Sequence, residues 1–89
     1  MRVEPRPHEV RRLVVEEFRG FGATGPILFD LEENIVVNRD RYVGRTYRLD
    51  GLMAMWLAEV GIVQFYDADG HMLATVNVFE RVPPRRMAV

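Results

Sequence analysis

The sequence predicts an α+β domain in which a mainly antiparallel sheet of about five strands packs against two helices. Three observations lead to this class. An early segment has apolar residues at helical spacing, later segments are short and rich in β-branched or aromatic residues, and turn-forming residues separate them. The 89 residues suit one domain, and 48% apolar with 28% charged residues is typical of a folded globular protein.

The first half of the chain is predicted to form a helix and then a three-stranded meander. Residues 1–7 contain two prolines and are interpreted as an N-terminal arm. Apolar residues of the next segment share one helical face, and glycines follow it, so a helix is predicted over 8–19. Polar turns then separate three expected strands, at 27–31, 35–37 and 42–49, and the turns are placed at 32–34 and 38–41.

The second half is predicted to form a helix and a C-terminal hairpin. Asp50 offers an N-cap, residues 51–60 contain one polar side chain, Glu59, and Gly61 offers a C-terminal stop. Strands are expected at 62–66 and 71–79, around a turn at 67–70, and 82–89 is interpreted as a tail. The expected order is therefore helix, three strands, helix, two strands, in a single domain over 1–89.

The composition excludes the familiar nucleophilic enzymes. The chain has no cysteine and no serine, so a disulfide, a thiolate nucleophile and a serine-type triad are all excluded. The adjacent carboxylates at 16–17 and 32–33 do not face each other and make no acid–base dyad. No catalytic residue is predicted, and an enzyme or a small-molecule site could arise only from residues that folding brings together.

Charge and hydropathy indicate a soluble, cytoplasmic protein. The net charge is −1, which gives no overall attraction for nucleic acid or an anionic membrane. All 12 basic residues are arginine, which favours a bacterial source with a GC-rich genome over dedicated anion recognition. The longest apolar run, Leu52 to Ala58, is far shorter than the roughly 20 residues of a membrane span, and the N-terminus is not a signal peptide.

Two short motifs suggest ligand sites, but the residues around each motif do not fit such a site. Residues 20–25 match the G-x-G-x-x-G pattern of dinucleotide sites, which requires a strand before it and a helix after it, the reverse of the order expected here. Asp67, Asp69 and His71 could bind a divalent ion, but the segment lacks the further oxygen ligands of a calcium loop. Aspartate and glycine are common in turns. No cofactor and no metal ion is predicted.

Residues 39–48 form the most suggestive segment, with four arginines, one aspartate and two tyrosines. Arginine beside aromatic side chains on a sheet is typical of single-stranded nucleic-acid recognition. In a regular strand, Arg45 and Tyr47 share the more apolar face. The candidate binding residues are Arg39, Arg41, Tyr42, Arg45, Tyr47 and Arg48.

Three other interpretations of this segment remain open. Asp30, Glu32 and Glu33 can pair with the arginines across the sheet, which is the favoured reading. Arg45 could instead bind another anionic partner, or serve as an inward-pointing charge that protects a sheet edge from wrong pairing.

The segment 51–60 suggests an interface. A helix that is apolar nearly all round must be covered on more than one side. Met53, Met55 and Trp56 are therefore candidate contacts with a protein partner or a second copy of the chain. The leading hypothesis is a non-enzymatic interaction module that forms a homodimer, and the alternative is a nucleic-acid or anion binder.

Overall fold

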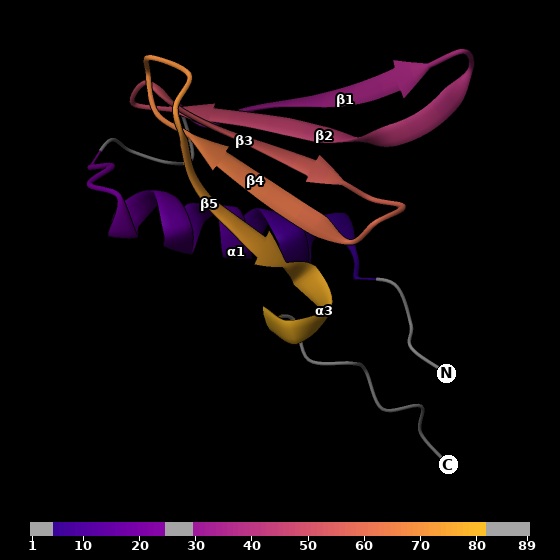
Figure 1. Ribbon diagram of the computed structural model, residues 1–89, viewed down its shortest axis with the longest axis horizontal. Helices are drawn as coiled ribbons and strands as arrows, with labels where there is room; N and C mark the ends of the chain where they lie inside the picture. Colours follow the sequence, from indigo (N-terminus) through magenta and orange to yellow (C-terminus); the bar gives the residue numbers. More distant parts are fainter. Residues whose placement is uncertain (1–4, 25–29, 82–89) are drawn as a thin grey trace.

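A five-stranded antiparallel sheet with one long helix across it forms the described part of the chain, residues 5–24 and 30–81 of the computed structural model (Figure 1). The elements are α1 (Pro7–Gly20), β1 (Glu32–Asn38), β2 (Arg41–Leu49), β3 (Leu52–Leu57), β4 (Ile62–Tyr66), β5 (Met72–Asn77) and α3 (Val78–Arg81). The sheet order is β1-β2-β3-β4-β5. The predicted α+β class with a five-stranded antiparallel sheet is confirmed, and all five strands form one continuous meander.

Helix α1 matches the prediction from periodicity. Pro7 occupies the first turn, and the backbone N–H of Arg6 donates to the Glu9 carboxylate at 2.9 Å, which satisfies one free group at the helix start. The apolar face is fully buried and consists of Val10, Leu13, Val14 and Phe18. Burial of this face against the sheet, rather than intrinsic helix propensity, stabilises the helix.

The prediction of a helix over 51–60 is wrong, because Leu52–Leu57 is the central strand β3. Asp50 and Gly51 have φ angles of 51° and 81°, the left-handed pair that makes a tight hairpin between β2 and β3. Asp50 therefore lies in a turn rather than at an N-cap, and its carboxylate accepts the backbone N–H of Thr24 at 2.9 Å. The following apolar run is too short for a stable helix and pairs on both sides instead.

Three further boundaries differ from prediction. Residues 32–34 were expected to form a turn, but Glu32–Asn38 is one continuous strand paired with β2. The last strand ends at Asn77 rather than at 79, since the Asn77 side chain accepts the Phe79 N–H at 2.9 Å and the chain turns into α3. Most of the strand predicted at 27–31 lies outside the described residues, and the rest of it is not in a strand.

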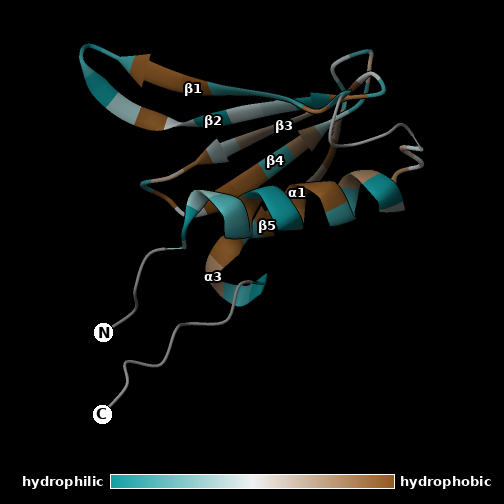
Figure 2. Cartoon of the chain, turned by 180° about the vertical axis from the view of Figure 1, so that it is seen from behind, coloured by the Kyte–Doolittle hydropathy of each residue, from teal (hydrophilic) through white to brown (hydrophobic). Residues whose placement is uncertain are grey.

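The core lies between α1 and one face of the sheet, here called the helix face (Figure 2). Phe18 of α1 meets Phe65 of β4 edge to face, with ring centroids 5.8 Å apart. The helix-face residues of β2 to β5 are nearly all buried: Tyr47, Leu49, Ala54, Trp56, Val63, Phe65 and Val76. Short α3 closes one end, where Arg81 forms an ion pair with Glu17 of α1 at 2.6 Å.

The opposite side of the sheet, here called the open face, is not covered by any described element (Figures 1 and 2). Because strand side chains alternate, the neighbours of buried Ala54 and Trp56 point to this side. The register aligns the open-face residues in rows, such as Thr46, Met55, Gln64 and Thr75. This face is therefore a broad surface of the sheet that no described element covers.

Candidate functional site

The six residues of the predicted arginine–tyrosine site do not gather on one surface. Arg45 and Tyr47 lie on the helix face, while Arg48 lies on the open face. Arg39 lies in the β1–β2 turn, with a φ of 53°. Arg45 and Tyr47 are therefore separated from Arg48 by the thickness of the sheet.

A bulge in β2 modifies the expected alternation at the hairpin end. Val36 pairs with Gly44 and Val37 with Tyr42, so Val43 is the extra residue. As a result Tyr42 lies on the same side as Arg45, whose Nε donates to the Tyr42 hydroxyl at 3.3 Å. In a regular strand these two residues, three positions apart, would lie on opposite faces.

Glu33 of β1 joins two arginines that are distant in the sequence. One carboxylate oxygen accepts Arg11 Nε of α1 at 2.8 Å, and the other accepts Arg45 at 3.0 Å. The side chains of Arg45 and Glu33 are only 21% and 16% exposed, so this pair is half-buried. The bridge links α1 to the β1–β2 hairpin, and Glu33 supplies the acidic partner for the charge on the helix face.

The environment of Arg45 favours its charged form. The hydrogen bond to Tyr42 raises the pKa of the guanidinium most, burial lowers it, and Glu33 raises it again. Tyr42 also meets the Trp56 ring edge to face, with centroids 6.4 Å apart. Arg45 is thus engaged by side chains of its own chain.

Two buried polar groups have no hydrogen-bond partner among the described residues, the Tyr47 hydroxyl and the Trp56 indole nitrogen. Tyr47 is 0% exposed, and burial raises the pKa of its phenol well above the ordinary value, with the nearby Glu33 charge adding to the effect. Burial therefore disfavours ionisation of the Tyr47 phenol in the folded state.

The three predicted interface residues divide between the two faces. Trp56 is 5% exposed and belongs to the core. Met53 and Met55 are half-buried on the open face, and Leu57 continues the same line. We call Met53, Met55 and Leu57 the outer stripe of β3. The signal for Leu57 was present in the apolar run 52–58 but was hidden by its interpretation as a helix.

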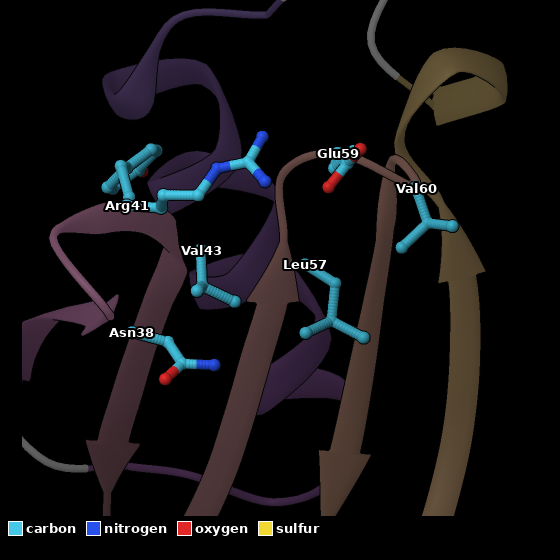
Figure 3. A pocket seen from close by; sticks show the side chains of 7 residues that line it. Asn38, Arg41, Val43, Leu57, Glu59 and Val60 are labelled. Carbon is cyan, nitrogen blue, oxygen red and sulfur yellow. The ribbon is translucent and has the colours of Figure 1, made fainter.

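A shallow hollow lies at one end of the outer stripe, on the side of the sheet away from α1 (Figure 3). It has a volume of about 260 Å³ and is lined by Asn38, Arg41, Tyr42, Val43, Leu57, Glu59 and Val60. Arg41 and Glu59 lie on opposite sides of it (Figure 3). The stripe thus ends in an apolar floor with one positive and one negative group at its rim.

The carboxylate–imidazole cluster in the β4–β5 turn has a structural role. Ligand atoms of Asp67, Asp69 and His71 lie within 4.8 Å of one another. Asp67 accepts the backbone N–H groups of Asp69 and His71, each at 2.9 Å, and the His71 bond contributes most to a lowered pKa of Asp67. These bonds are those of an aspartate that closes a turn.

The element that precedes the glycine-rich segment is a helix, as the sequence indicated. Gly20 ends helix α1, and Gly22 has a φ of 102°, while residues 25–29 lie outside the described residues. A helix rather than a strand precedes the glycines, which is the wrong side for a dinucleotide loop.

Comparisons with protein-family models, with curated proteins and with solved structures found no significant match to this chain. No helix within the described ranges has the length and apolar character that crossing a membrane requires.

Proposed function

We propose that this chain is a non-enzymatic interaction module that binds a partner protein through the outer stripe of β3. One observation carries the proposal: the central strand is apolar on both faces, whereas α1 covers only one of them. An antiparallel sheet with one solvated face normally has polar residues on that side.

The two strands that flank β3 differ on the open face. β2 presents Thr46 and Arg48 there, whereas β4 presents Ile62, Gln64 and Tyr66. The outer stripe itself consists of two methionines and a leucine, and Ile62 and Tyr66 of β4 lie directly beside its two ends. Methionine repacks readily against different surfaces, which suits a contact with a second protein.

The occupant that fits this surface best is an amphipathic helix. Three alternate strand residues span about 13 Å, which corresponds to about nine residues of an α-helix. The other side of β3 already contacts one such helix, since α1 presents its apolar face there. Arg48 lies near one end of the stripe, and Arg41 and Glu59 lie beside the other, so charges on the partner helix can fix its direction.

A designed peptide tests this proposal. The probe is a 14-residue amphipathic helix of leucine, lysine and glutamate, and a scrambled peptide of equal composition is its control. We expect saturable NMR shifts of the Met53, Met55 and Leu57 methyl groups with the amphipathic peptide only. No shift at saturating peptide, or shifts confined to other methyl groups, would reject the proposal. Methyl shifts that depend on protein concentration alone would assign the stripe to a second copy of the chain instead.

A matched pair of variants sharpens the test. Met55 and Thr75 lie in the same row of the open face, two strands apart. Met55→Glu should abolish peptide binding, whereas Thr75→Glu should leave it within about twofold, because a small change at the rim of an interface costs little. Equal loss in both variants would indicate a general charge effect rather than the stripe.

The nucleic-acid alternative stays a prediction. Arg39, Arg41 and Arg48 are exposed, and no described acidic residue lies within ion-pair distance of them. Binding to a random single-stranded oligonucleotide at low salt, which weakens steeply as salt is added, would support that alternative.

A further inference from the structure

We propose that two copies of this chain pair antiparallel along β1, so that the segment Asn34–Asn38 of each lies beside the other around a two-fold axis at Val36. Among the described residues, β1 forms one edge of the sheet and pairs with β2 alone. An edge strand presents a row of backbone N–H and C=O groups that can hydrogen-bond to another strand. The inference does not rest on the proposed helix contact, which uses a different surface.

The sequence of this segment is self-complementary. It reads Asn-Ile-Val-Val-Asn, which has the same chemical order in both directions. Antiparallel pairing about Val36 sets Asn34 opposite Asn38, Ile35 opposite Val37, and Val36 opposite its own copy. All five residues are uncharged, and the three central ones are β-branched, the class that strands favour. Self-pairing about a two-fold axis requires a strand that is complementary to its own reversed copy, and this segment meets that condition.

The apolar side chains of this segment are exposed to solvent in the single chain. Ile35 and Val37 are 58% and 59% exposed, although both are large apolar residues inside a regular strand. The apolar part of β1 lies next to the free end of the β1–β2 hairpin (Figure 2). In the proposed register each of these side chains contacts the other residue type of the second copy, so all four become covered.

Charge is compatible with this register. The two acidic residues of β1, Glu32 and Glu33, lie outside the paired segment, at the end of the strand away from the turn. The two-fold axis brings this end towards the turn of the second copy, where Arg39 is exposed. In this register Arg39 approaches Glu33 of the second copy and Asp40 approaches Glu32, so each end of the paired segment combines one opposite-charge and one like-charge approach.

The other sheet edge is less suited to pairing. β5 carries the extra residue of a bulge at Phe65/Tyr66, and α3 begins directly after Asn77. In the β1–β2 pair the extra residue, Val43, belongs to β2, so β1 itself is continuous. Bulges and short strands are devices that protect an edge from pairing, and β1 lacks both over Asn34–Asn38.

The paired surface is small, so the dimer should be reversible. Five residues a side fall below the roughly 1,200 Å² of a standard interface. Sedimentation velocity from about 10 μM to about 1 mM should show the mass rising from the 10.3 kDa of one chain towards twice that value. A single 10.3 kDa species at the highest concentration would overturn the proposal.

Lysine variants locate the contact. Val37→Lys should abolish the rise in mass, because it places a charge opposite the apolar Ile35 of the second copy. Val60→Lys is the matched control, since Val60 is 64% exposed and lies in the β3–β4 turn. Far-ultraviolet circular dichroism confirms that both variants fold. A rise in mass that survives Val37→Lys, or that Val60→Lys or Met55→Glu removes, would contradict pairing through β1.

A cysteine probe tests the register. The natural chain has no cysteine, so one introduced thiol can form only an intermolecular disulfide. Residues directly opposite in an antiparallel pair have Cβ atoms about 4.5–5.5 Å apart, near the separation that a disulfide needs. Val36→Cys should therefore form a covalent dimer under mild oxidation at least tenfold faster than Val60→Cys. Equal rates would overturn the two-fold axis at Val36.

Discussion

The buried hydroxyl of Tyr47 makes an unusual prediction, because removing it should stabilise the protein. The residue is fully buried between α1 and the sheet, and its hydroxyl has no hydrogen-bond partner within the described ranges. Tyr47→Phe keeps the aromatic ring and its packing and removes only the unsatisfied oxygen. The substitution therefore separates the cost of the polar group from the benefit of the ring.

The size of the effect follows from the cost of burying a hydroxyl. Without a partner this cost is about 1–3 kcal/mol in proteins. The nearby Glu33 carboxylate offers partial electrostatic compensation, so the lower end of the range applies. We expect the free energy of unfolding to rise by about 1 kcal/mol, which corresponds to an increase of about 4–8 °C in Tm for a chain of this size.

Urea and thermal unfolding measure this gain, and Tyr66→Phe is the matched control. The Tyr66 hydroxyl donates to the Gln64 side chain at 3.0 Å, so its removal should lower stability by about 0.5–1 kcal/mol. Opposite signs for the two substitutions are the expected result. If Tyr47→Phe destabilises the protein as much as Tyr66→Phe does, the Tyr47 hydroxyl has a hydrogen-bond partner and the reasoning fails.

The same residue predicts a loss of stability at high pH. The folded state raises the pKa of Tyr47, so its contribution is complete below the unfolded pKa of about 10 and falls as the pH rises above it. Urea midpoints between about pH 9 and pH 11 should fall more steeply in the natural protein than in Tyr47→Phe. Parallel slopes would show that Tyr47 does not titrate differently in the two states.

Two further substitutions and one titration test the Glu33 bridge, the packing at Gly44 and the β4–β5 turn. Glu33→Gln should lower the free energy of unfolding by about 1 kcal/mol, and by less in high salt, because it weakens the bridge between α1 and β2; urea unfolding at two salt concentrations measures both. Gly44→Ala should cost about 2 kcal/mol or more in thermal unfolding, since a Cβ there overlaps the Trp56 carbonyl oxygen. The hydrogen bond from the backbone N–H of His71 is the main cause of the lowered pKa of Asp67. The turn should therefore lose stabilisation as the pH falls below about 4 and Asp67 becomes protonated. An NMR titration of Asp67 with a midpoint at or above the ordinary aspartate value would contradict this.

The elements that sequence predicts well are those that local patterns determine. Helix α1 follows from its apolar periodicity, and the β4–β5 hairpin follows from the turn at Asp67–Gly70. β3 was missed because leucine, methionine and alanine favour helices, whereas the decisive signal was the Asp50-Gly51 pair with two positive φ angles. The helix preference of these six residues was outweighed by the two turn residues and by pairing with two neighbouring strands.

The candidate site shows the same division. Alternation correctly separates Arg45 from Arg48, and internal pairing with an upstream carboxylate was among the interpretations of the segment. The role of Arg11 could not be predicted, because it reaches Glu33 across 22 positions of sequence and only the docking of α1 brings them together. The bulge at Val43, which turns Tyr42 towards Arg45, likewise depends on strand pairing.

The neighbour-to-neighbour order of the sheet has a consequence for how the chain acquires its structure. Each strand pairs with the one before it in sequence, so each hairpin can close over a short loop. Such local pairings favour rapid folding. Helix α1 precedes every strand, so during synthesis its apolar side is already present when the first hairpin forms. The sheet can then extend strand by strand across that helix, and its last strand needs no rearrangement of the earlier ones.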